Sequence, residues 1–224
     1  MATFTQHSSY DDYTQVAGFG NIMGWGAKPA LIIIDVCKAY WTAGSPLDIT
    51  SSPTGGDAPA SMRNLLSAAR EGRIPVVWTQ VLYTHPEMKD AGLFYSKAKA
   101  LAVWHKDDKR GLDKWVEGLE PERDDVIVTK QYSSAFFGTS MGSTLKAMGV
   151  DTVVICGVST SGCVRATTLD ALQNVTAFRL QVVGSACGDR SAEIHNANLF
   201  DMHAKFADVV SEEEAIEKLK TGWK

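Results

Sequence analysis

A cysteine at a tight turn is the first residue whose type and setting predict chemistry. Cys163 follows an apolar run at residues 153–156 and a glycine-bounded segment at 157–162, and it begins a stretch with helical spacing, CVRATTLDAL. A thiol at a helix N-terminus faces unpaired N–H groups and the positive end of the helix dipole, so we expect its pKa to be lowered. The alternative is a buried structural cysteine, because free cysteines are often buried.

Two other reactive side chains also follow predicted strands. Asp35 ends the apolar run ALIIID, Thr79 and Gln80 lie toward the end of the next run, and Lys130 follows residues 126–129. The carboxyl ends of parallel strands meet at one edge of a sheet, where ligands bind in open α/β folds. Taken singly, Asp35 could form an Asx-type turn or a cap after the strand, and Lys130 could be an ordinary surface lysine. Their convergence with Cys163 predicts a reactive site.

These three residue types suit attack on an amide or carbamoyl carbon. Cys163 would be the nucleophile, Asp35 would take its proton, and Lys130 would keep Asp35 ionised or stabilise negative charge in the intermediate. Backbone N–H groups near Ser159 and Cys163 would bind the oxyanion. Water would then hydrolyse the thioester. Because no histidine follows a predicted strand, a Cys–His pair is the weaker hypothesis.

The elements that must position these residues alternate along the chain. We predict strands at residues 30–35, 74–81, 126–129, 153–156, 178–183 and 207–210, and helices at about 60–71, 140–148, 161–172 and 192–203. Ser211 and Glu214 form a capping box for a last helix. The pattern predicts an α/β fold, a three-layer α-β-α sandwich with a central, mostly parallel six-stranded sheet.

Composition narrows the function classes. The 224 residues are 45% hydrophobic with a net charge of −4, which fits one large domain and gives no electrostatic case for nucleic acid. No apolar run is long enough for a membrane span, and the polar N-terminus is not a secretory signal. The four cysteines lack CxxC or zinc-type spacing, which favours a cytoplasmic protein with free thiols. Residues 1–28 are predicted to form an arm with an intersubunit role, and 29–224 a single domain.

Four stretches carry a resemblance to a known family. They are PALIIIDVCKAYW, VIVTKQYSSAFFGTS, GVDTVVICGVSTSGCVRATTLDAL and GDRSAEIHNANLFDMHAKFADVVS. With them the chain resembles the isochorismatase-like cysteine hydrolase superfamily, and within it the N-carbamoylsarcosine amidohydrolases. The resemblance covers the chain from about residue 29 and is looser over 43–125.

The resemblance implies a catalytic triad of Asp35, Lys130 and Cys163. It also implies a cis peptide between Val158 and Ser159, which would point the N–H groups of Ser159 and Cys163 at the oxyanion. Arg190, in the Gly-Asp-Arg motif, would hold a substrate carboxylate, as a guanidinium does well; an ordinary pairing with Asp189 is the alternative. A homodimer or homotetramer is the assembly that the family implies.

Several aromatic residues are candidates for the walls of a substrate pocket, although we expect core packing for at least two of them: Trp41, Trp78, Tyr132, Phe136 and Phe137. Nicotinamidases of this superfamily bind a metal through an Asp-x-His pattern and a later histidine. Here His85 stands without that pattern, so we predict no metal and no cofactor and disfavour nicotinamide as substrate. Isochorismatase activity, which does without the nucleophilic cysteine, is disfavoured too.

The resulting hypothesis is a cysteine-dependent amidohydrolase that acts on a small N-carbamoyl or amide compound of the N-carbamoylsarcosine type. A lactam, a biuret-like urea, and a maleamate-like or ureidoacrylate-like acid are alternative substrates. A peroxide sensor or thiol oxidoreductase using Cys156 or Cys187 is a second enzyme hypothesis, which no CxxC motif supports. A catalytically idle binding or assembly protein on the same fold is the non-enzyme alternative.

Overall fold

The sheet has six parallel strands in the order β3-β2-β1-β4-β5-β6. The computed structural model describes residues 16–174 and 178–223. Its strands are β1 (Pro29–Ile34), β2 (Val76–Val81), β3 (Val126–Lys130), β4 (Thr152–Val158), β5 (Arg179–Gly188) and β6 (Asp208–Val210). The predicted α/β architecture is therefore confirmed, and the sheet is parallel throughout.

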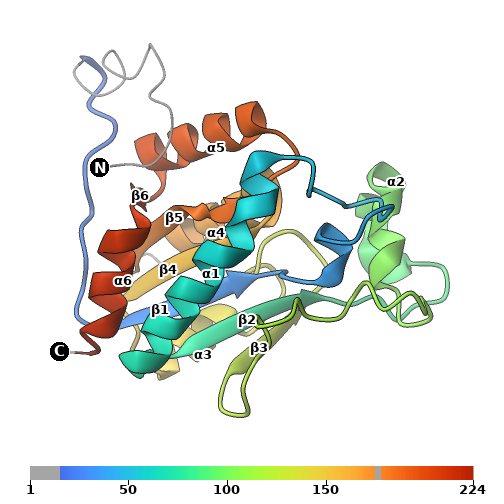
Figure 1. Ribbon diagram of the computed structural model, residues 1–224, viewed down its shortest axis with the longest axis horizontal. Helices are drawn as coiled ribbons and strands as arrows, with labels where there is room; N and C mark the ends of the chain where they lie inside the picture. Colours follow the sequence, from blue (N-terminus) through green and yellow to red (C-terminus); the bar gives the residue numbers. More distant parts are fainter. Residues whose placement is uncertain (1–15, 175–177, 224) are drawn as a thin grey trace.

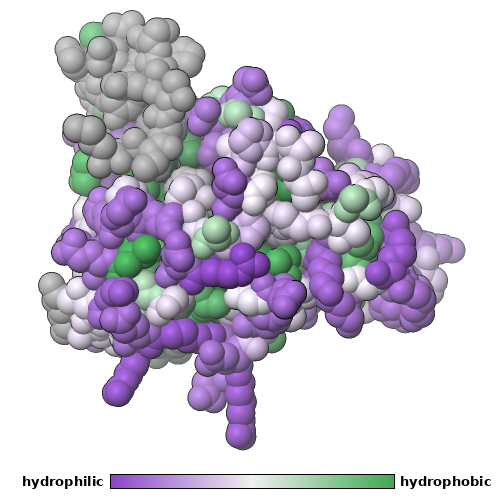
Figure 2. All heavy atoms as spheres, in the orientation of Figure 1, coloured by the Kyte–Doolittle hydropathy of each residue, from purple (hydrophilic) through white to green (hydrophobic). Residues whose placement is uncertain are grey.

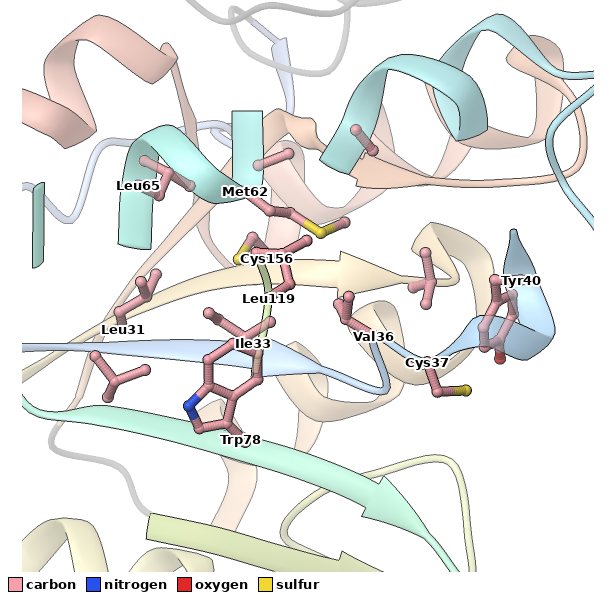
Figure 3. Packing of buried hydrophobic residues seen from close by; sticks show 14 of the residues in the cluster. Leu31, Ile33, Val36, Cys37, Tyr40, Met62, Leu65, Trp78, Leu119 and Cys156 are labelled. Atoms are coloured by element: carbon pink, nitrogen blue, oxygen red, sulfur yellow. The ribbon is translucent and has the colours of Figure 1, made fainter. Parts of the chain in front are cut away.

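Helices cover both faces of this sheet (Figure 1). The helix α1 (Pro53–Glu71) and the helix α6 (Glu212–Lys220) pack on one face, and α3 (Met141–Ala147), α4 (Arg165–Asn174) and α5 (Ala192–Lys205) pack on the other. The alternating side chains of β1 divide between two apolar clusters: Leu31 and Ile33 face α1, as Figure 3 shows, whereas Ile32 and Ile34 face the opposite layer.

A long connection links β2 to β3. It contains the short helical turns η3 (Lys89–Ala91) and η4 (Lys99–Trp104) and the helix α2 (Gly92–Lys97). A further turn, η2 (Lys38–Tyr40), follows β1. Figure 1 shows α2 beyond the carboxyl ends of β1 and β2, so this connection lies at the edge of the sheet where Asp35 and Lys130 stand.

Helix α1 begins earlier than the sequence pattern predicts. It starts at Pro53 rather than near residue 60, with Ser52 at its N-cap and Pro59 inside it. Pro59 has no N–H to give to the carbonyl of Gly55, four residues before it. The indole N–H of Trp41 donates to that carbonyl at 2.8 Å instead, which satisfies a buried acceptor.

The described part of the N-terminal arm binds its own chain. The N–H groups of Met23 and Gly24 donate to the carboxylate of Asp208 at 3.0 and 2.7 Å, and the indole of Trp25 donates to Glu214 at 2.7 Å. Residues 1–15 of the predicted arm lie outside the described residues. These contacts hold residues 23–25 against β6 and α6 of the same chain.

The surface is mainly polar on the face of Figure 2, where hydrophobic residues form small separate areas between charged ones. Among the described helices, none is both long enough and apolar enough to cross a bilayer.

Candidate active site

The structure brings Asp35, Lys130 and Cys163 together at the carboxyl edge of the sheet. Asp35 directly follows β1, Lys130 is the last residue of β3, and Cys163 lies in the helical turn η5 (Thr160–Val164) that follows β4. The Lys130 Nζ lies 2.7 Å from the Asp35 Oδ2 and 3.4 Å from the Cys163 Sγ. One buried ammonium therefore bridges a carboxylate and a thiol.

Asp35 is held by its own backbone conformation and by Thr79. Its φ of 52° lies in the left-handed region, which aspartate tolerates better than most residues. The Asp35 N–H donates to Thr79 Oγ1 at 3.0 Å, and the Thr79 hydroxyl donates to Asp35 Oδ1 at 2.6 Å. Sequence reasoning placed Thr79 near a strand end without assigning it this role. The two bonds leave Oδ2 to face Lys130.

Lys130 is fully buried, and its ammonium has acceptors in Asp35, Cys163 and Tyr132. Besides Asp35 and Cys163, its ammonium donates to the carbonyl of Tyr132 at 3.0 Å. Burial works against the charged form, but the interactions with the acidic groups of Asp35 and Cys163 outweigh the burial, so the pKa of Lys130 is raised. The side chain is thus a cation at the edge of the sheet.

The Cys163 thiol is less acidic than the sequence setting predicts. Burial raises its pKa to about 12; the positive charge of Lys130 lowers the pKa, and the charge of Asp35 raises it again. The expectation of a lowered pKa is therefore wrong for the protein without a ligand. A neutral thiol beside a carboxylate must transfer its proton before or during attack.

The turn that carries Cys163 has an unusual backbone. The peptide bond between Val158 and Ser159 is cis, at the position that the family resemblance implies. Gly157 has a φ of 121°, and a Cβ there would lie 2.3 Å from the carbonyl oxygen of Ile34 in β1, so no side chain fits. Among the described residues, none accepts a hydrogen bond from the Ser159 N–H.

A second set of polar residues holds the same turn from β5 and α5. The buried carboxylate of Asp189 accepts from the Ser161 N–H at 2.7 Å. The Thr160 hydroxyl lies 3.2 Å from the carbonyl of Gly188 and 2.8 Å from the Nδ1 of His195. Sequence reasoning assigned neither Asp189 nor His195 this role; the Gly-Asp-Arg motif was the available signal.

Arg190 lies beside this turn. Its Nη1 is 3.3 Å from Asp189 Oδ1 and 3.4 Å from the Ser161 Oγ, and its side chain is 63% exposed. The ordinary pairing with Asp189 therefore exists. Because most of the guanidinium remains open to solvent, the pairing leaves donors for a ligand.

Two of the five aromatic candidates lie in the hydrophobic core. Trp78 is fully buried against the α1 layer, where its indole N–H donates to Asp125 at 2.8 Å. Phe136 is buried in the cluster on the opposite face of the sheet. Both were candidates for the pocket walls, and the sequence analysis expected core packing for at least two of the five aromatic candidates.

The remaining predicted aromatics lie elsewhere. Trp41 supports α1 as described above. Tyr132 and Phe137 are exposed and contact each other edge-on with ring centroids 5.2 Å apart, and Tyr132 stacks on Phe94 at 6.3 Å. Through its carbonyl bond to Lys130, Tyr132 still connects this aromatic surface to the site.

A cavity of about 160 Å³ adjoins Asp35 on the side of β2. Its lining includes the Cys37 thiol, which accepts from the Trp104 indole at 3.4 Å. Burial raises the pKa of Cys37 to about 12. The lining residues are Asp35, Cys37, Thr79, Gln80, Val81, Leu82, Trp104, Asp113 and Trp115.

Among the described residues, no group of three or more His, Cys, Asp or Glu side chains is arranged to hold a metal ion.

Sequence comparisons relate the chain to a known family. The Isochorismatase domain family matches residues 29–214. A maleamate amidohydrolase of Pseudomonas putida is 40% identical, covering 95% of this chain and 96% of its own length. An N-carbamoylsarcosine amidase of an Arthrobacter species is 30% identical, covering 90% of this chain and 75% of its own length.

The fold also matches solved structures. A cysteine hydrolase of Pseudomonas syringae pv. phaseolicola superposes with a TM-score of 0.79 at 21% identity, covering 90% of this chain and 98% of that one. The sequence comparisons correct one expectation, since the maleamate amidohydrolase is more similar to the chain than the N-carbamoylsarcosine amidase is.

Proposed function

This chain belongs to the isochorismatase family, and we propose that it hydrolyses the amide of a small carboxylic acid of the maleamate type, with Cys163 as the nucleophile. The reaction class, hydrolysis of C–N bonds other than peptide bonds, follows from relatives at 40% and 30% identity that are both amidohydrolases. The observation that carries the proposal is the Lys130 ammonium, which contacts both Asp35 and Cys163.

Acylation begins from a neutral thiol, a carboxylate and an ammonium. The Cys163 sulfur forms a bond to the amide carbon while the thiol proton passes to Asp35. The carbonyl oxygen gains the displaced electron pair and is held by the N–H groups of Ser159 and Cys163. When the C–N bond breaks, Asp35 returns the proton to the leaving nitrogen, so ammonia departs and a thioester remains.

Deacylation reverses the proton movements with water in place of ammonia. Asp35 takes a proton as the water oxygen bonds to the thioester carbon. The C–S bond then breaks, and the proton returns to the sulfur. Lys130 remains protonated throughout, because its raised pKa and its contact with Asp35 favour the cation. The cycle consumes one water and releases one acid and one ammonia.

Arg190 is the proposed anchor for the substrate carboxylate. Its exposed guanidinium borders Ser161, two residues before the nucleophile. Maleamate and N-carbamoylsarcosine both carry a carboxylate a few bonds from the carbon under attack, which suits recognition by arginine. N-carbamoylsarcosine is the second candidate substrate, because the relative named for it is 30% identical to this chain.

A substrate panel tests the proposal. The purified protein is incubated with maleamate, N-carbamoylsarcosine, a ureido acid, a lactam and maleamide, the uncharged diamide, and ammonia release or ring opening is measured. We expect maleamate to be turned over with the highest kcat/KM, and Cys163→Ala to abolish turnover. Arg190→Ala should raise KM for the acids more than for the diamide. Turnover of only uncharged compounds would contradict the acid specificity.

The assembly remains a prediction. We propose a homo-oligomer, supported by the family resemblance and by the exposed aromatic surface of Phe94, Tyr132 and Phe137 next to the site. Light scattering measures its mass, and a monomer at micromolar concentration would contradict the prediction.

A further inference from the structure

The carboxylate of Asp189 joins two parts of the site. Asp189 directly follows β5 and is 1% exposed. Its Oδ2 accepts from the Ser161 N–H at 2.7 Å, and its Oδ1 accepts from Arg190, from the backbone N–H at 2.8 Å and from Nη1 at 3.3 Å. One buried carboxylate therefore fixes both the turn that carries Cys163 and the guanidinium proposed to bind the substrate's carboxylate.

The backbone of Asp189 is held independently of this carboxylate. Gly188, the residue before it, pairs with Val158 in the parallel ladder of β4 and β5, which lie side by side in Figure 1. The hydroxyl of Thr54 in α1 donates to the Asp189 carbonyl at 3.2 Å. Because strand pairing and α1 already place the residue, the hydrogen bonds of its charged side chain serve to fix its two partners relative to each other.

We propose that Asp189 is a positioning residue that makes the site selective for acids whose carboxylate lies at one set distance from the carbon under attack. This inference rests on the proposed function of the same site. The N–H groups of the turn hold the carbonyl oxygen of the substrate and Arg190 holds its carboxylate, so the separation of these two groups decides which acid amide fits both. The buried carboxylate that binds the turn and the guanidinium together keeps that separation fixed.

Thiol reagents of graded length test this without turnover. N-iodoacetylglycine and its homologues made from β-alanine and γ-aminobutyrate carry a carboxylate four, five and six bonds from the reactive carbon, and each has a neutral carboxamide counterpart. The rate of alkylation of the Cys163 peptide is measured by mass spectrometry for all six reagents. The ratio of the acid rate to the amide rate reports carboxylate recognition at each length, and it cancels changes in thiol reactivity.

Three variants separate positioning from general support of the turn. Asp189→Asn is nearly isosteric but replaces one acceptor oxygen with an NH₂ group, which then faces a donor. Thr160→Val is the matched control, because the Thr160 hydroxyl supports the same turn through Gly188 and His195. Arg190→Lys changes an exposed residue, keeps its charge and removes the guanidinium fork, so it tests the pairing even if Asp189→Asn does not fold.

We expect the wild type to prefer the acid at one length, and Asp189→Asn to lower that acid-to-amide ratio about tenfold, the scale of one hydrogen bond to a charged group. Arg190→Lys should lower the same ratio, and the two changes combined should lower it by less than the product of their separate effects. Thr160→Val should slow the acid and the amide alike. A length preference that survives in Asp189→Asn or in Arg190→Lys, or no acid preference in the wild type, would overturn the inference.

The outcomes also separate this inference from the proposed function. A length preference that Asp189→Asn removes, in a protein that hydrolyses no acid amide, would support positioning by Asp189 while refuting the proposed function. Turnover of maleamate with wild-type ratios in Asp189→Asn would do the reverse.

Discussion

Removal of the Lys130 charge is predicted to destabilise the protein strongly. Lys130 is 0% and Asp35 2% exposed, and their charged atoms lie 2.7 Å apart. Lys130→Met keeps an unbranched apolar chain but leaves the Asp35 carboxylate buried with only the Thr79 hydroxyl and no cation. Breaking a buried pair by removing one partner costs about 3–5 kcal/mol. We expect a loss of that size in the free energy of unfolding, measured by urea denaturation at pH 7.5.

A second substitution separates this cause from lost packing. The double variant Asp35→Asn/Lys130→Met should be more stable at pH 7.5 than Lys130→Met alone.

Two results would refute this reasoning. One is a loss below about 1 kcal/mol at pH 7.5, which is the range of exposed ion pairs. The other is a double variant whose loss equals the sum of the two single losses, because additivity would mean that the two charges do not interact.

Three further predictions concern the helix support and the thiols. Trp41→Phe removes the donor to the Gly55 carbonyl and should lower the free energy of unfolding by about 1 kcal/mol. In a Pro59→Ala background the loss should be smaller, because the N–H of residue 59 can then donate to that carbonyl. Equal losses in the two backgrounds would contradict this. The pKa of Cys187 is about 12 in the fold and about 8.5 when unfolded. The raised pKa stabilises the fold fully only below the unfolded pKa, so the free energy of unfolding of the wild type should fall by about 2 kcal/mol between pH 8 and 10 because of this thiol. In chemical denaturation at the two pH values, Cys187→Ala should show a correspondingly smaller fall. For Cys163, with a pKa of about 12, the rate of iodoacetamide alkylation should still rise with pH above 9; a plateau near pH 7 would show a preformed thiolate.

The strand ends could be predicted from the sequence because their signals are local. The apolar runs before Asp35 and Lys130 and the turn before Cys163 each mark the end of a buried strand. Parallel order then places them on one edge without knowledge of any contact. The structure brings the same three side chains together.

What the sequence did not reveal depends on tertiary contacts. The start of α1 was missed because Pro and Gly residues in its first turns are typical of loops, and the Trp41 bond that supports Pro59 comes from outside the helix. The pKa of Cys163 was predicted in the wrong direction because burial and Asp35 oppose the helix terminus and Lys130. Whether Trp78 faces the core or a pocket depends on the strand face that it occupies in the sheet.

Isolation of the acyl-enzyme is the most direct test of the central claim. The protein is mixed with maleamate, quenched in acid within milliseconds and digested. The mass of the peptide that contains Cys163 is then measured. The account predicts a mass increase equal to the acyl group on that peptide, together with ammonia release, and neither in Cys163→Ala. Ammonia release by Cys163→Ala at the wild-type rate would contradict it, because the sulfur could then not be the nucleophile.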